Sequence, residues 1–323
     1  MTAASYAEPL LAWYARAARD LPWRAAAAGP WSVLVSEFML QQTPVNRVLP
    51  AHARWLARWP SPPALAADPA GEAIREWGRL GYPRRALRLH ATARIITADH
   101  EGNVPSSVEE LRALPGVGSY TAAAIASFAF SQRHAVLDTN VRRVLARLVG
   151  GSPGPSSASV SVAETRLAQS LLPDASPVAA RWSVALMELG ALVCVAGTPR
   201  CGECPLAAQC AWLAAGRPAA DRPAAGTGPG AGTRAGAGTR AGAGTRAGAS
   251  RTQRYEGTDR QCRGRILALL RGAGHPVPRV DFDPVWPDQV QLDRALAGLV
   301  SDGLAEPVPG GAYTLPGDPH QIT

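Results

Sequence analysis

Two carboxylates, Glu37 and Asp138, stand where an acidic side chain suits acid–base chemistry. Glu37 is the only charged residue in the apolar stretch 31–43, which we expect to be a helix. Burial there would raise its pKa and let it hold a proton near neutral pH, as a general acid must. Asp138 begins an arginine-rich amphipathic stretch, where the positive end of a helix keeps a carboxylate ionised. The pair suits proton donation beside a fixed anion that faces a developing positive charge.

Each carboxylate also has a plain structural interpretation. Glu37 can be an exposed or hydrogen-bonded residue of an ordinary helix. Asp is a favourable N-cap, so Asp138 can be explained as the cap of the helix that follows it. Neither position alone decides between structure and chemistry.

A glycine-containing turn lies upstream of Asp138, between two apolar helical patterns at 107–114 and 119–130. Gly116 and Gly118 can adopt positive φ and carry no Cβ, so a ligand can lie on the backbone amides that open the second helix. The positive end of that helix favours a phosphate. A helix–turn–helix packing loop without any ligand is the alternative.

Four of the five cysteines lie close together, at Cys194, Cys201, Cys204 and Cys210. Bunched cysteines indicate metal binding in a reducing compartment rather than disulfides. Zinc usually takes two C-x2-C pairs, and only one such pair occurs here. The spacing therefore favours an iron–sulfur cluster, with zinc as the alternative. We expect the fifth, Cys262, to be packed in a core.

The charge and hydropathy of the chain favour a phosphate-binding protein without a membrane span. The net charge is +8 over 323 residues, and all 33 basic residues are arginine. Such a surface fits phosphate binding, although a codon bias toward GC also explains the choice of arginine. No signal peptide is recognisable, and the most apolar stretch, 184–196, is too short for a membrane span and carries Glu188. We expect a cytoplasmic protein.

The hydrophobic patterns predict an all-α protein, since no clear period-2 run occurs. Residues 50–100 indicate two or three helices, with a turn at 78–83. There Tyr82 lies among basic residues, a combination that can stack on bases and bind phosphate. A solvated loop is the alternative for this turn.

The chain divides into three parts. Residues 1–216 form the core with the cysteine cluster, and 217–257 form a flexible linker that contains the hexamer GTRAGA three times. Residues 258–323 resume globular patterning. Helices at 263–270 and 291–299, followed by a hairpin of 304–307 with 313–315, predict a small winged-helix-like module.

Four features together resemble one family: LPGVGSYTA at 114–122, LDTNVRRVLAR at 137–147, SEFMLQQT at 36–43, and the cysteine spacing. Over residues 19–210 the chain is similar to the helix–hairpin–helix DNA glycosylases, and within them to the adenine glycosylases of the MutY type. SEFMLQQT distinguishes that type from its endonuclease III relatives. The resemblance implies a helix–hairpin–helix fold with one 4Fe–4S cluster on the four cysteines.

The resemblance also implies roles for the catalytic residues. Asp138 matches the carboxylate that stabilises an oxocarbenium-like transition state. Glu37 matches the acid that protonates the adenine ring nitrogen and handles the water. Tyr120 and Asn140 match supporting residues of the active site.

A further set is implied to contact DNA or adenine: Leu21, Trp23, Gln42, Thr43, Tyr82, Gly116 and Gly118. Leu21 and Trp23 match the adenine pocket, and the two glycines match the phosphate-binding turn. Gln42 and Thr43 match positions at the base opposite adenine. Tyr82 matches a wedge residue, although Pro83 follows it where many relatives have an aromatic or polar residue.

The implied function is removal of adenine mispaired with 8-oxoguanine or guanine in double-stranded DNA, by a monomer that needs no membrane. The chain has no lysine, and the family position of an attacking amine holds Tyr120, so we expect a monofunctional glycosylase. Residues 258–315 are too short and too helical for the Nudix-like domain with which many relatives read 8-oxoguanine. Two alternatives are a thymine glycosylase for G:T mispairs and a non-catalytic iron–sulfur DNA-binding regulator.

Overall fold

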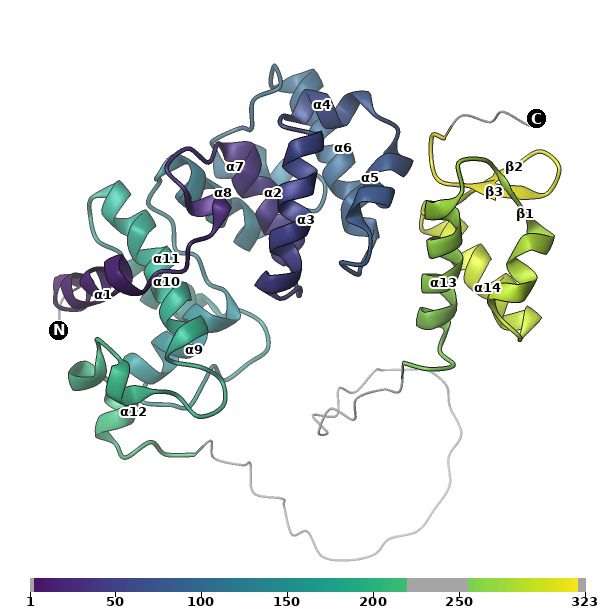
Figure 1. Ribbon diagram of the computed structural model, residues 1–323. Helices are drawn as coiled ribbons and strands as arrows, with labels where there is room; N and C mark the ends of the chain where they lie inside the picture. The colour runs from purple at the N-terminus through teal and green to yellow at the C-terminus, as the bar shows by residue number, and fades with distance from the viewer. Residues whose placement is uncertain (1–2, 220–254, 319–323) are drawn as a thin grey trace, which may run out of the picture.

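In the computed structural model, residues 3–219 and 255–318 are described, and helices dominate both ranges. The predicted linker lies almost wholly outside them, as do its repeats. The core consists of two helical lobes, and the C-terminal module lies beside α5 (Figure 1). No helix in the described ranges is long and apolar enough to cross a membrane. The prediction of an all-α core is confirmed.

The first lobe holds the helices that carry Glu37 and the hairpin. They are α2 (Pro30–Leu40), α3 (Val45–Arg58), α4 (Pro62–Ala67), α5 (Ala70–Trp77), α6 (Arg84–Asp99), α7 (Val108–Ala113) and α8 (Ser119–Phe130). Their shared core includes Trp55, Trp59 and Trp77, packed edge to face. Four helices occupy 45–99, where the sequence predicted two or three.

The second lobe holds Asp138 and the cysteines. It comprises α1 (Ala3–Ala17), α9 (Thr139–Leu148), α10 (Val162–Ser170), α11 (Ser176–Leu192), η2 (Cys201–Glu203), η3 (Ala207–Gln209) and α12 (Ala211–Ala214). A short helix, η1 (Pro22–Arg24), leads from α1 into the first lobe. Each lobe therefore supplies one of the two carboxylates.

Helix α2 ends at Leu40, three residues before the predicted end at Thr43. Gln42 adopts a left-handed φ of 56°, which a continuing helix does not allow. The carbonyl of Phe38 near the end of α2 accepts a hydrogen bond from Arg85 at 3.3 Å, and so does Gln41 O. A guanidinium from α6 thus stabilises the early end, a long-range contact that local sequence does not reveal.

The C-terminal module has the winged-helix order of elements. It contains α13 (Asp259–Gly272), β1 (Val277–Pro278), η4 (Arg279–Val285), α14 (Gln289–Ser301), β2 (Glu306–Val308) and β3 (Ala312–Thr314). The strands form an antiparallel sheet in the order β1-β3-β2. Both predicted helices and the hairpin are confirmed, whereas the two-residue β1 was not predicted. Cys262 is fully buried in this module, as expected.

The module is joined to the first lobe at α5. Arg75 forms an ion pair with Asp318, and Arg271 donates to Ile74 O at 3.0 Å. Gly71 N donates to Pro316 O at 2.7 Å. The module approaches so closely there that a Cβ on Gly71 would lie 2.6 Å from the side-chain atom Asp318 Oδ1 and 3.1 Å from the backbone atom Pro316 O. Gly71 is therefore a steric requirement of the docked module.

We predict that Gly71→Ala weakens this docking, because the added methyl overlaps backbone and side-chain atoms of the module. Such overpacking costs about 1–3 kcal/mol. Thermal unfolding and amide exchange at 69–75 and 315–318 measure the effect. The matched control is Gly272→Ala, at the end of α13, where an added Cβ would meet no described atom within 4 Å. Equal stability and exchange in both variants would contradict the prediction.

Candidate active site

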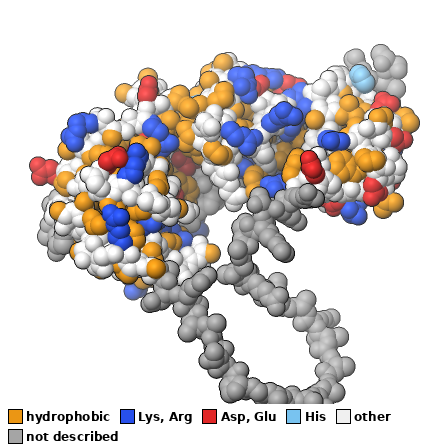
Figure 2. All heavy atoms as spheres, turned by 60° about the horizontal axis from the view of Figure 1, so that its bottom comes forward, with side chains coloured by type: hydrophobic (Ala, Val, Ile, Leu, Met, Phe, Trp, Pro, Cys, Tyr) orange, Lys and Arg blue, Asp and Glu red, His pale blue; other side chains and the backbone are white. Residues whose placement is uncertain are grey.

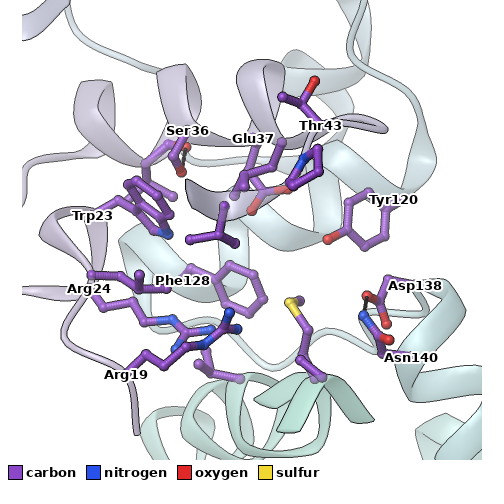
Figure 3. A pocket seen from close by; sticks show the side chains of 18 of the residues that line it. Arg19, Trp23, Arg24, Ser36, Glu37, Thr43, Tyr120, Phe128, Asp138 and Asn140 are labelled. Carbon is purple, nitrogen blue, oxygen red and sulfur yellow. Dashed lines mark hydrogen bonds between the residues drawn. The ribbon is translucent and has the colours of Figure 1, made fainter. Parts of the chain in front are cut away.

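A pocket of about 370 Å³ lies at the junction of the two lobes (Figure 3). Its wall brings together Glu37 from α2, Tyr120 from α8, and Asp138 and Asn140 at the start of α9. All four predicted catalytic residues therefore meet at one cavity. The remaining wall includes residues of α1, η1 and α11, together with the turn between α2 and α3.

Glu37 is buried, with 6% of the residue exposed. Its pKa is raised from 4.5 to about 7, mainly because burial disfavours the charged form and secondly because Asp138 is nearby. A hydrogen bond with Tyr120 and the charge of Arg24 act in the opposite direction. Glu37 is therefore buried as expected and not exposed, and its raised pKa is that of a group able to donate a proton near neutral pH. The alternative of a hydrogen-bonded Glu also holds, through Tyr120.

Asp138 is the N-cap of α9, so its structural interpretation is also correct. Its Oδ1 accepts from Val141 N at 2.6 Å, and its Oδ2 accepts from Asn140 Nδ2 at 2.9 Å. Burial raises the pKa of Asp138 above its ordinary value, although these hydrogen bonds lower it. The helix start acts in the expected direction, but desolvation outweighs it.

Tyr120 lies between the two carboxylates, with its hydroxyl directed into the pocket (Figure 3). Burial raises its pKa well above the ordinary value, and the negative charges of Glu37 and Asp138 raise it further. The group is therefore a neutral phenol at physiological pH. It offers a hydrogen bond but no nucleophilic anion.

Asn140 links Asp138 to the rest of the second lobe. Its Oδ1 accepts from Arg143 Nη2 at 2.7 Å, and the same guanidinium donates to Gly190 O at 2.7 Å and to Cys194 O at 2.8 Å. A Cβ on Gly190 would lie 2.7 Å from the Cβ of Asn140. This close approach of α11 to α9 fixes the catalytic end of α9 and ties it to the cysteine loop.

The sequence did not predict the ion pairs behind the pocket wall. Arg19 and Arg24 line the pocket, and both bind Glu188 of α11, which lies outside the lining. Glu188 accepts from Arg19 Nε and Nη2, each at 2.8 Å, and pairs with Arg24 at 2.9 Å. Burial opposes ionisation of Glu188, but these hydrogen bonds outweigh it and lower its pKa to about 2. Arg24 Nη1 is buried and has no hydrogen-bond partner among the described residues. That N–H group is available to a ligand.

A signal for Glu188 was present in the sequence. It is an isolated acid in an apolar helix, the same feature that marked Glu37, but it served only to exclude a membrane span. Its arginine partners lie 164 residues or more away in sequence, and no local pattern connects them to α11.

The predicted base-contact residues separate into two groups. Leu21, Trp23 and Thr43 line the pocket and are buried. Gln42 is exposed and lies outside the pocket, so the turn presents Gln42 and Thr43 to different surroundings. Tyr82 is 51% exposed and also lies outside it.

The hairpin between α7 and α8 has the predicted left-handed glycine at Gly116, whereas Gly118 is extended with a φ of −90°. Gly116 adopts a φ of +83°, and a Cβ there would lie about 3 Å from Arg88 and Phe38. Gly118 is the N-cap of α8, and no described side chain caps this helix start. The first amides of α8 are therefore free to meet a phosphate. Ser107 caps α7 by accepting from Glu110 N at 3.2 Å.

The four clustered cysteines border one small cavity together with Arg147 and Trp212. Burial raises the pKa of Cys204 to about 11, with smaller contributions from the other three thiols. Arg147 Nη1 donates to Cys194 Sγ at 3.4 Å. No group of three or more His, Cys, Asp or Glu in the described ranges has the spacing of a single-ion site. The donor set, all thiols around one space, fits an iron–sulfur cluster.

Comparisons with known proteins agree with this geometry. Residues 35–166 match the model of the HhH-GPD superfamily of base excision DNA repair proteins. The chain is 48% identical over 310 residues to a Mycobacterium tuberculosis protein named adenine DNA glycosylase, covering 96% of this chain and 93% of that one. A protein of the same name from Mycolicibacterium smegmatis is 46% identical, with 96% and 95% covered.

A solved structure is also similar. A thermostable thymine-DNA glycosylase superposes with a TM-score of 0.58 at 26% identity, over 66% of this chain and 97% of that one. Its match is limited to about two thirds of the chain. The mycobacterial matches cover nearly the whole chain.

We predict that Glu37→Gln stabilises the protein at alkaline pH. The folded-state pKa is about 7 against 4.5 for the free group, so folded Glu37 binds its proton more tightly than unfolded Glu37. The wild type therefore loses stability as pH rises from about 4.5 through 7, whereas the amide does not titrate. The gain should approach roughly 3 kcal/mol above pH 7 and vanish below pH 4.5. Denaturant unfolding at pH 5 and 8 measures it, and a pH-independent difference would argue against a buried carboxylate.

We predict that the purified protein is brown and contains about four iron and four labile sulfide per chain. Cys201→Ser should lose colour and DNA affinity together, because the cluster holds the loop of the second lobe. Cys262→Ser, in the C-terminal module, is the matched control and should keep the colour. Stoichiometric zinc without visible absorption would favour the zinc alternative.

Proposed function

The chain belongs to the adenine DNA glycosylases of the HhH-GPD superfamily, and from that premise we propose that it hydrolyses the N-glycosidic bond of adenine mispaired with 8-oxoguanine or guanine. The observation that carries the proposal is the pair Glu37 and Asp138 in one buried pocket. One carboxyl has a pKa of about 7 and the other is held by hydrogen bonds at a helix start.

The reaction makes two chemical demands that this pair meets. Adenine is a poor leaving group as an anion, so protonation of a ring nitrogen by Glu37 assists its departure. The sugar becomes cationic as the bond breaks, and Asp138 stabilises that charge. Tyr120, a neutral phenol, hydrogen-bonds Glu37, and Asn140 orients Asp138. Once adenine has left with the proton that Glu37 donated, the ionised Glu37 accepts a proton from the attacking water.

The pocket suits a planar purine. Leu21 and Trp23 supply apolar walls, and the edge-to-face contact of Trp23 with His52, 5.0 Å between centroids, fixes the indole. The unpartnered Nη1 of Arg24 offers a donor to a ring nitrogen. Burial of the base also excludes water from Glu37 and keeps its pKa high.

The enzyme must bind the DNA backbone while adenine is flipped out of the duplex. Gly116, Gly118 and the open start of α8 would bind a backbone phosphate beside the pocket. Tyr82 and Gln42, both exposed, are the proposed contacts on the side of the opposite base. The arginine-rich composition favours double-stranded DNA as the partner.

The proposed cofactor is one 4Fe–4S cluster on Cys194, Cys201, Cys204 and Cys210. When bound, it would cross-link the loop that follows α11, and no step of the reaction passes through it. The chain's own contribution is the link from Cys194 O through Arg143 to Asn140. Through these hydrogen bonds, a loop held rigid by the cluster would also hold Asp138 in place.

The proposed organisation follows the sequence boundaries: a glycosylase core at 1–216, a linker at 217–257 and a winged-helix-like module at 258–323. We propose a monomer that acts in the bacterial cytoplasm at the nucleoid. The similarity to a thymine-DNA glycosylase supports one competing function, removal of thymine from G:T mispairs. Glu37 favours adenine, because a proton donor at this position suits a purine leaving group.

The base-release assay tests the proposal directly. With duplexes containing A:8-oxoG, A:G, A:C or T:G, free adenine should appear from the first two. Asp138→Asn and Glu37→Gln should fold and bind duplex but excise on the order of 10²–10³-fold more slowly, the usual loss for an electrostatic group of the transition state. Release of thymine from T:G alone would favour the competing function, and wild-type rates in either variant would contradict the mechanism.

We predict a monofunctional reaction that leaves the abasic strand intact. Strand-cleaving glycosylases attack the sugar with an amine. The chain has no lysine, Tyr120 is a phenol, and arginine stays protonated. Strand breaks should appear only after alkali, and borohydride should trap little covalent complex. Efficient trapping would mean that the N-terminal amine reaches the pocket.

A further inference from the structure

Tyr82 is held in an unfavourable backbone conformation on the surface. Its φ is +48°, in the left-handed region that residues other than glycine seldom occupy. Its neighbour Gly81 has a φ of +85° and accepts a hydrogen bond from Trp77 Nε1 at 2.9 Å. The side chain is nevertheless 51% exposed, so its own burial does not stabilise this conformation.

Arg85 holds Tyr82 from within the core. Its guanidinium carbon lies 4.7 Å from the Tyr82 ring centroid and 5.9 Å from that of Trp77. The same group donates to Phe38 O and Gln41 O, directly before Gln42. Arg85 N donates to Tyr82 O at 3.0 Å. One buried arginine thus joins the two exposed segments that we assign to the opposite base.

Arg260 of the C-terminal module reaches the same ring. Its guanidinium carbon lies 6.0 Å from the Tyr82 ring centroid. The docked module brings it there, since Arg84 beside the loop pairs with Asp302 of the module at 3.2 Å. A cation over an aromatic face is attractive, and it restricts where the ring can move.

The module carries little free positive charge with which to bind a DNA backbone. Acidic residues outnumber arginines at 255–318, and they stand out on the module in Figure 2. The single arginine of α14, Arg294, pairs with Asp259 at 2.7 Å. Arg279 pairs with Asp283 and Asp293, each at 2.6 Å. With the pair of Arg263 and Asp302, three of the six arginines at 255–318 are therefore paired within the module.

We propose that the C-terminal module acts on opposite-base recognition through Tyr82, with Arg260 as a positioning residue that holds the 78–83 loop against Arg85. This inference rests on the proposed function, because it gives the module a part in reading the base opposite adenine. The module supports the loop of the core and is not itself a second reader of DNA.

The test compares Arg260→Ala with Arg279→Ala in the full chain. Arg279 is a matched control, since it is an arginine of the same module whose ion pairs all stay within the module. Amide exchange of 78–83 without DNA is the first readout. The second is the ratio of single-turnover adenine release opposite 8-oxoguanine to that opposite guanine.

Arg260→Ala should raise exchange in the loop and reduce the ratio, each by about three-fold, the size expected for one exposed cation–π contact. Arg260→Lys should restore both, because an ammonium also binds an aromatic face. Gly71→Ala, which displaces the whole module, should exceed Arg260→Ala in both readouts. Arg279→Ala should match the wild type.

Unchanged exchange at 78–83 in Arg260→Ala would overturn the inference, whether or not Gly71→Ala raises it. So would an Arg279→Ala variant whose ratio falls as far as that of Arg260→Ala, because the module would then be acting through its own surface. A wild type that releases no adenine from any duplex would overturn the proposed function instead. The exchange measurement would still decide whether Arg260 positions the loop.

Discussion

Two carboxyl groups that share a buried pocket cannot both ionise cheaply, and the catalytic end of this protein depends on that constraint. Burial and the nearby charge of Asp138 raise the pKa of Glu37 to about 7. Asp138 has direct backbone and amide donors, which partly offset its own desolvation. The two environments thus give one kind of side chain two roles, with Glu37 as the acid and Asp138 as the anion.

The two-lobe construction allows this separation. Glu37 comes from an apolar helix of the first lobe, and Asp138 from a helix start in the second. Gly190 lets α11 approach Asn140, and Arg143 connects that contact to the cysteine loop. The ion pairs of Glu188 with Arg19 and Arg24 join α11 to the segment that leads from α1 through η1 into the first lobe. A change in lobe packing therefore alters both the distance and the desolvation on which the pKa of Glu37 depends.

The features of the site that could be predicted from the sequence are those that a local pattern of residues encodes. An isolated charge in an apolar helix identified Glu37, the preference of Asp for helix N-caps identified Asp138, and the spacing of the cysteines identified the cluster site. The sequence missed what requires the tertiary fold: Glu188 pairs with arginines 164 or more residues distant, and Arg85 ends α2 from another helix. The paired strand β1 is only two residues long, too short for any period-2 signal. The separation of Gln42 from Thr43 follows from a positive φ that the sequence does not specify.

The pH dependence of the chemical step tests the central claim, that Glu37 supplies a proton to the leaving base. It is measured as adenine release in single turnover with saturating enzyme, so that binding and product release do not contribute. The account predicts a rate that is level below pH 7 and falls about ten-fold per pH unit once Glu37 has titrated, near or above its pKa of about 7. A rate that stays constant from pH 6 to pH 9, or that rises with pH, would contradict it.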